Sequence, residues 1–184
     1  MTNKKKIILV IAVIFLAAAS RLIKHPYNFT PIIAMSIFAG CYFKQRWGLI
    51  LPLAAMLISD YFIGFYDWQV MTAVYLSIAL SYLIGWILAK NLKWYNVIFS
   101  SLISSVTFFL ITNFSVWAFF NWYPHNWPGL VNCFVLALPF FRNSLVGDLF
   151  YTGLIFSVYN LALIWINKMV PKDRENKYGK ISIQ

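Results

Sequence analysis

Charged residues are scarce in this chain, and acidic residues are the scarcest. Only five of the 184 residues are Asp or Glu, and all charged residues together make up 11% of the sequence. A soluble domain has about 25% charged and about 45–50% apolar residues, whereas 61% of this chain is hydrophobic. A domain of this size would also leave roughly 30% of its chain surface in water. The composition therefore excludes a water-soluble enzyme and a disordered regulator, and it predicts a protein of the lipid bilayer.

Cysteine and histidine are also rare, with two residues of each type. Cys41 and Cys133 fall near opposite membrane faces in the topology derived below, so we expect no disulfide and exclude a disulfide-stapled secreted module. The sequence contains no zinc-type or haem-type cysteine spacing, no Gly-rich phosphate loop, no His-Glu-x-x-His motif and no Gly-x-Ser-x-Gly motif. We therefore expect no cofactor, no metal site and no catalytic residue, and we predict that the protein is not an enzyme.

Long apolar runs are what the chain has in abundance. A helix that crosses about 30 Å of hydrocarbon needs about 20 mostly apolar residues. Six runs are candidates: Ile7–Ile23, Pro31–Phe43, Trp47–Phe65, Val70–Ala89, Val97–Phe120 and Asn143–Ile166. The second run is short for a span. The sequence predicts an all-α integral membrane protein, with these six runs forming a six-transmembrane-helix bundle.

The segment Asn121–Arg142 is treated differently because it contains Pro124, Pro128 and Pro139. Proline disrupts a helix interior because it lacks an N–H group and clashes with the preceding turn. The apolar part of this segment, Trp127–Phe141, is also short for a span. We predict a short outer re-entrant or interfacial segment that packs over the bundle.

The distribution of Lys and Arg sets the expected orientation, because cytoplasmic loops are enriched in both residues. With six spans and a cytoplasmic N-terminus, twelve of the 15 basic residues lie inside, and only Arg21, Lys24 and Arg142 lie outside. Both termini are therefore predicted to be cytoplasmic, with a single transmembrane domain over residues 1–170 and a cytoplasmic polar tail over 171–184. The positive charge faces anionic lipid. Without a folded basic domain, it does not indicate nucleic-acid binding.

The N-terminal order of basic, apolar and small residues over Lys4–Ala19 also resembles a signal peptide. Its cleavage would leave five spans and an outside N-terminus. We expect it to be retained, because the apolar run continues to Ile23 and Arg21 fits a structural role.

Polar residues within the apolar runs gather toward the predicted outer side. Asp60 and Asp148 each lie about 7–8 Å from the outer end of a run. Asn113 lies in the outer half of the fifth run, while Arg21 ends the first run and Arg142 opens the last. In one hypothesis the aspartates form ion pairs with the arginines and fasten the helices together. In the other, these side chains surround an outward-open site for a polar solute, and the two hypotheses are compatible.

Three ring-bearing residues add to this region. Trp117 follows Asn113 by four residues and therefore shares its helix face, where it could stack on a flat solute or pack in the core. His25 and His125 fall in predicted outer loops, where hydrogen bonding is a more common role than metal ligation. The serine-rich stretch Ser100–Ser105 is expected to line a helix–helix seam.

Several motifs also carry a resemblance to a known family. They are Arg21–Pro31 (RLIKHPYNFTP), Ala34–Gly40, Pro52–Asp60, Thr112–Phe114, Tyr123–His125 and Ala137–Tyr151 (ALPFFRNSLVGDLFY). With them the chain resembles a bacterial family of uncharacterised transport proteins, similar to the substrate-binding S components of energy-coupling-factor vitamin importers and to solitary cobalamin transporters. The resemblance implies an S-component-like bundle in the bacterial inner membrane that imports a vitamin-like solute such as cobalamin or a related corrinoid. Membrane lipid, the solute, and an energy-coupling transmembrane subunit with its ATPase module are the implied partners.

The two lines of reasoning select one set of candidate substrate-binding residues. They are Arg21, His25, Asn28, Asp60, Asn113, Trp117, His125, Arg142, Asn143 and Asp148. The chain departs from S components where Leu16 stands four residues after Ala12 in place of a second alanine. Two alternatives stay open: an integral-membrane enzyme acting on lipid, with Asp60 and Asp148 as acid and base, and a structural subunit of a membrane complex held by Ser100–Ser105.

Overall fold

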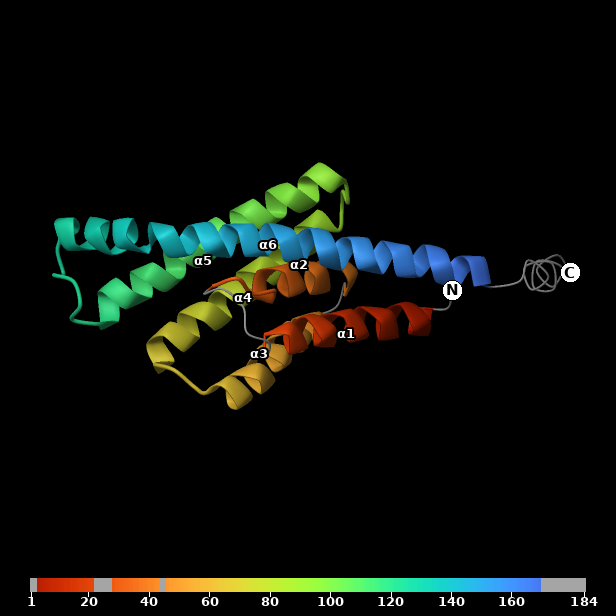
Figure 1. Cartoon of the computed structure of the whole chain (residues 1–184), viewed down its shortest axis with the longest axis horizontal. Helices are drawn as coiled ribbons and strands as arrows, with labels where there is room; N and C mark the ends of the chain where they lie inside the picture. The colour runs from red at the N-terminus through yellow and green to blue at the C-terminus, as the bar shows by residue number, and fades with distance from the viewer. Residues whose placement is uncertain (1–2, 22–27, 44–45, 170–184) are drawn as a thin grey trace, which may run out of the picture.

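The computed structural model describes residues 3–21, 28–43 and 46–169, and within these ranges the chain forms helices and no strand. The helices are α1 (Asn3–Ser20), α2 (Ile32–Tyr42), the 3-10 turn η1 (Arg46–Leu49), α3 (Ile50–Ile63), α4 (Trp68–Leu88), α5 (Trp94–Phe119) and α6 (Trp127–Met169). Figure 1 shows them as an elongated bundle with α6 running along its length. The predicted all-α class is confirmed, while the predicted tail over 171–184 lies outside the described residues.

Helix α2 forms the centre of the bundle, although it has only eleven residues. Every residue from Ile32 to Cys41 is buried, and α2 packs against α1, α3, α4, α5 and α6. A helix that is apolar on all sides is stable only where neighbours cover every face. The apolar run Pro31–Phe43 thus corresponds closely to a helix. At about 16 Å this helix is much shorter than the hydrocarbon core of a bilayer.

Aromatic rings join α2 to α6. Phe38 is fully buried and meets Phe156 edge-on, with ring centroids 5.3 Å apart, and Tyr159 with centroids 5.2 Å apart. Tyr42, one turn further along α2, lies 4.3 Å from Tyr159 between ring centroids. Edge-to-face aromatic pairs add stabilisation beyond the area that they bury. This cluster therefore fixes the second half of α6 against the central helix.

The crossing of α2 and α4 depends on two glycines. A Cβ atom on Gly40 would collide with the backbone carbonyl of Tyr82, and one on Gly85 would collide with the carbonyl of Ile37. The two helices therefore touch backbone to backbone, with one glycine supplied by each. Small residues permit this close approach, which is frequent where apolar helices pack together.

Within the described residues, three helices are long and apolar enough to cross a membrane: α4, α5 and α6. The first two correspond to the runs Val70–Ala89 and Val97–Phe120. Helices α1, α2 and α3 contain shorter apolar stretches of 10–17 residues. The predicted run Trp47–Phe65 corresponds to η1 and α3, which follow each other directly over Arg46–Ile63, and Gly64 is the C-cap of α3. Gly64 has φ +112°, a backbone conformation that favours glycine and ends a helix.

The separate segment predicted over Asn121–Arg142 is wrong. Residues from Trp127 onward belong to α6, which continues without interruption to Met169. Pro124 precedes the helix, and Pro128 lies in its first turn, where a missing N–H costs no helical hydrogen bond. Only Pro139 occupies the helix interior. One internal proline removes a single hydrogen bond, which the flanking apolar turns tolerate.

Replacing Gly85 by alanine should test the close α2–α4 contact. Because the added methyl group must displace the Ile37 backbone, Gly85→Ala should lower the stability of the purified protein by about 1–3 kcal/mol. Gly153→Ala in α6 is the matched control, since a Cβ there meets nothing within 4 Å. The control should keep or gain stability, by up to about 1 kcal/mol. Equal thermal unfolding temperatures for the two variants would contradict the backbone contact.

Candidate functional site

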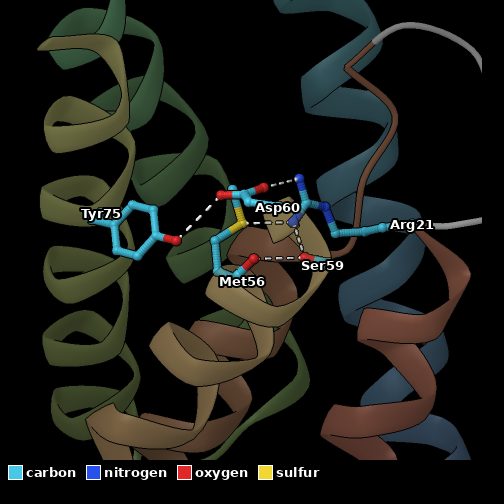
Figure 2. Close-up of polar contacts among 5 residues, drawn as sticks. All are labelled: Arg21, Met56, Ser59, Asp60 and Tyr75. Carbon is cyan, nitrogen blue, oxygen red and sulfur yellow. Dashed lines mark hydrogen bonds and ion pairs between the residues drawn. The ribbon is translucent and has the colours of Figure 1, made fainter. Parts of the chain in front are cut away.

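Arg21 and Asp60 form a buried ion pair (Figure 2). Arg21 stands in the turn that ends α1, and Asp60 lies in the last turn of α3. Their Nη2 and Oδ1 atoms are 3.1 Å apart, and the side chains are 9% and 2% exposed. This ion pair is one of those predicted from the positions of these residues within the apolar runs, and it is confirmed. Because two charges leave water together, each depends on the other for compensation.

Further contacts enclose the pair, as Figure 2 shows. The Tyr75 hydroxyl of α4 donates a hydrogen bond to Asp60 Oδ2 at 3.2 Å. Arg21 Nη1 donates to the Ser59 hydroxyl and contacts the Met56 sulfur, while Ser59 itself donates to the Met56 carbonyl. The network therefore joins the ends of α1 and α3 to α4, and this connection indicates a fastening role.

Tyr66 lies in the loop between α3 and α4, close to the same pair. Burial and the nearby Asp60 carboxylate raise the pKa of Tyr66 to about 12, while the Arg21 guanidinium opposes this shift. The phenol therefore remains neutral at physiological pH. It adds no charge next to the ion pair.

Asp148 is the second buried aspartate, and its surroundings are different. It is 4% exposed, and its Oδ2 lies 2.6 Å from the Ser105 hydroxyl of α5. Ser105 is also 2.9 Å from the Ser101 carbonyl, and the Thr152 hydroxyl donates to Ser101 Oγ at 3.2 Å. These contacts make a polar ladder along the α5–α6 interface, where the serine-rich stretch was expected to line a seam. No cation pairs with Asp148 in the described part of the chain.

The expected partner of Asp148, Arg142, is exposed and has no ion pair with any described residue. The helix geometry explains the difference. Six residues at about 100° each place the two side chains on different faces of α6, whereas helical pairs require a spacing of three or four. The expectation that Arg142 pairs with a buried aspartate is therefore wrong.

A separate cavity of about 270 Å³ lies between α4, α5 and α6, next to the short segment that precedes α2. Its polar lining comes from Asn28, Thr112, Asn113 and Ser144, and the rest is apolar and aromatic. The complete lining is Asn28, Val70, Val74, Phe108, Phe109, Thr112, Asn113, Ala137, Phe140, Phe141 and Ser144. The structure brings Asn28 and Asn113 together here, and neither Asp60 nor Asp148 lines this cavity.

The polar groups of this cavity retain unused hydrogen-bonding capacity. Asn113 Nδ2 donates to the Phe109 carbonyl at 2.8 Å, which leaves the amide oxygen without a partner among the described residues. Thr112 donates to the Phe108 carbonyl at 2.8 Å and can still accept. Asn28 has φ +60°, a left-handed conformation that asparagine tolerates better than most residues. Such groups beside phenylalanine rings suit a small ligand with an apolar ring and polar substituents.

The other predicted residues lie elsewhere. Trp117 donates from Nε1 to the Pro124 carbonyl at 3.0 Å, and its ring meets His125 with centroids 5.7 Å apart. His125 and Asn143 are exposed, and His25 lies outside the described residues. No group of three or more His, Cys, Asp or Glu side chains that could hold a metal ion occurs in residues 3–21, 28–43 and 46–169.

Sequence reasoning did not select several residues of these sites. Thr112 and Ser144 line the cavity, and both fall within motifs that carried the family resemblance. Tyr75 bonds to Asp60, but its position in an apolar run gives no polar pattern that would identify it. Ser59 was detectable, because it adjoins Asp60 in the sequence.

The two buried aspartates should respond differently to the same substitution. Asp60→Asn leaves the Arg21 guanidinium without a counter-charge, so stability should fall by about 3–5 kcal/mol. Asp148→Asn is the matched control: its amide can donate to Ser105 while Ser105 donates to the Ser101 carbonyl. The control should change stability by less than about 1 kcal/mol. Thermal unfolding with circular dichroism would measure both, and similar losses would contradict the different roles.

Comparisons with known proteins add one finding. A search of curated proteins found no match, and a search of solved structures found none. A family profile, described as Family of unknown function (DUF6580), matches residues 1–171. Because this match covers nearly the whole chain, the protein belongs to the DUF6580 family.

Proposed function

We propose that this protein is an integral membrane protein that binds a small, vitamin-like solute and imports it across the bacterial inner membrane without catalytic turnover. Membrane insertion is supported by α4, α5 and α6, whose length and composition suit a bilayer. Many large apolar side chains on these helices are exposed, among them Leu83, Phe99 and Leu161. A soluble monomer rarely exposes such extensive apolar surface, whereas hydrocarbon tails would cover it.

The proposed topology has six membrane-associated helices and both termini in the cytoplasm. It is supported by the twelve basic residues that this arrangement assigns to one side. Helices α1, α2 and α3 contain apolar stretches shorter than a full span, so this topology requires the bilayer to thin locally around them. In contrast, α6 is about 64 Å long and would extend beyond a bilayer of about 40–45 Å.

The cavity between α4, α5 and α6 is the observation that carries the proposed binding function. It combines phenylalanine rings with amide and hydroxyl groups that have unused hydrogen-bonding capacity. Pockets for drug-sized ligands measure about 300–1,000 Å³, and this cavity has about 270 Å³. The size therefore favours a solute with one or two rings. A corrinoid is larger than a drug-sized ligand, so its import would require α4, α5 and α6 to separate.

The partner implied for such an importer is an energy-coupling membrane subunit with an ATPase module. The described residues that line the cavity include no charged side chain. A neutral or zwitterionic solute is therefore favoured, because an isolated ion would lack a counter-charge there.

Reporter fusions would test the topology. A reporter at Lys90 or after Gln184 should be cytoplasmic, and one inserted after Gly64 should be outside, because the basic residues favour this orientation. Each site is fused to green fluorescent protein, which is fluorescent in the cytoplasm, and separately to alkaline phosphatase, which is active outside. A signal from one reporter of each pair shows that the fusion is expressed. Phosphatase activity from the C-terminal fusion would contradict the proposed topology.

Solute binding would test the function. Detergent-purified protein is titrated with nicotinamide, pyridoxine, pyridoxal, riboflavin and cobalamin, which carry no net charge near neutral pH, with thermal stabilisation as the measurement. One of the four smaller vitamins should stabilise the protein. For that vitamin, Asn113→Leu should lower affinity about tenfold or more, because it leaves a polar group of the solute unpaired.

The matched control is Asn143→Leu, which alters an exposed asparagine of α6 away from the cavity. It should bind like the parent. The proposal fails if none of the five vitamins stabilises the protein, or if both variants lose affinity equally.

A further inference from the structure

A second cavity, of about 700 Å³, forms a groove between the first half of α5 and the second half of α6. It shares no lining residue with the solute cavity. Its wall is mostly apolar, with Val97, Ile98, Leu149 and Phe156 among its residues. Gly153 also lines it, and a Cβ atom added there would meet nothing within 4 Å. The groove is thus wide at the middle of α6.

The polar ladder shows which residues of α5 lie level with which residues of α6 along the groove. Ser105 pairs with Asp148 and Ser101 with Thr152, so the helices run antiparallel and advance by four residues together. Continuing this register brings Lys93 level with Asn160, and both residues line the groove. One end of the groove is therefore cationic and polar, whereas the end near Leu149 is apolar.

The dimensions match one leaflet of a bilayer. Asn160 lies eleven positions after Leu149, which corresponds to about 16 Å along α6. Half of a hydrocarbon core is about 15 Å. At the polar end, Lys93 directly precedes α5, and Trp94 begins that helix beside it. Lysine and tryptophan at this depth are typical of the headgroup region.

We propose that this groove binds one anionic phospholipid. The Lys93 ammonium contacts the lipid phosphate, Asn160 and Ser157 offer hydrogen bonds to the headgroup, and an acyl chain lies along α6 past Gly153 toward Leu149. The charge at the polar end favours an anionic over a zwitterionic lipid. The inference rests on the proposed membrane insertion, but it does not depend on the solute or on the α4–α5–α6 cavity.

Lipid retention measured by native mass spectrometry would test this site. Detergent-purified protein is titrated with phosphatidylglycerol or with phosphatidylcholine that has the same acyl chains, and bound lipid is counted for each. Phosphatidylglycerol should saturate at one tightly held molecule, with phosphatidylcholine weaker. Lys93→Gln should weaken phosphatidylglycerol binding about fivefold, and Gly153→Leu should abolish the tight site by filling the groove.

Two matched variants control for charge and bulk. Lys168→Gln removes an exposed lysine from the end of α6, and Val158→Leu adds bulk to an exposed part of α6; neither residue lines the groove. Both should bind phosphatidylglycerol like the parent. The lipid site is overturned if the two lipids bind equally, if Lys168→Gln matches Lys93→Gln, or if Gly153→Leu retains the tight lipid. Failure to retain phosphatidylglycerol would also overturn the lipid site, whereas an intact vitamin response in Gly153→Leu keeps the solute proposal separate.

Discussion

The backbone contact between α2 and α4 determines how the other helices can be arranged. Because Gly40 and Gly85 let these helices touch, the short central helix remains covered on every side by longer neighbours. Phe38 then meets the rings of α6 from the opposite direction. A larger separation would open gaps around α2. Side chains that line such a gap have no neighbouring atoms on one side and therefore lose dispersion contacts. The positions of α5 and α6, and therefore of both cavities, follow from this packing.

Buried polar groups are treated in two ways in this bundle. Asp60 is matched by a full counter-charge from Arg21 and by a phenol from Tyr75. Among the described residues, Asp148 is matched by the hydroxyl group of Ser105, next to the Thr152–Ser101 hydrogen bond. The first arrangement fastens helix ends, and the second lines a continuous interface between two long helices. Neither carboxylate lines the α4–α5–α6 cavity, so its polar lining consists of neutral amides and hydroxyls.

Much of the fold could be predicted from the lengths of the apolar runs, since α2, α4 and α5 lie close to the expected boundaries. The extent of α6 could not be predicted in this way, because whether an internal proline ends a helix depends on the tertiary packing around it. Depth within the runs correctly suggested the Arg21–Asp60 pair. Depth alone could not predict that Arg142 and Asp148 lie on different faces of α6, whereas their spacing of six residues in a helix does predict it. The meeting of Asn28 with Asn113 depends on how distant segments pack, which no local pattern encodes.

Helix α6 lines both cavities. Ala137, Phe140, Phe141 and Ser144 face the α4–α5–α6 cavity, while Leu149, Gly153 and Asn160 face the groove further along. Because one helix carries both linings, a rotation or tilt of the whole of α6 would displace side chains in both cavities. If both cavities are occupied as proposed, an occupant that favours one position of α6 would change the affinity for the other occupant, and this coupling would be reciprocal. The composition of the surrounding leaflet would in this way act as an effector of solute affinity.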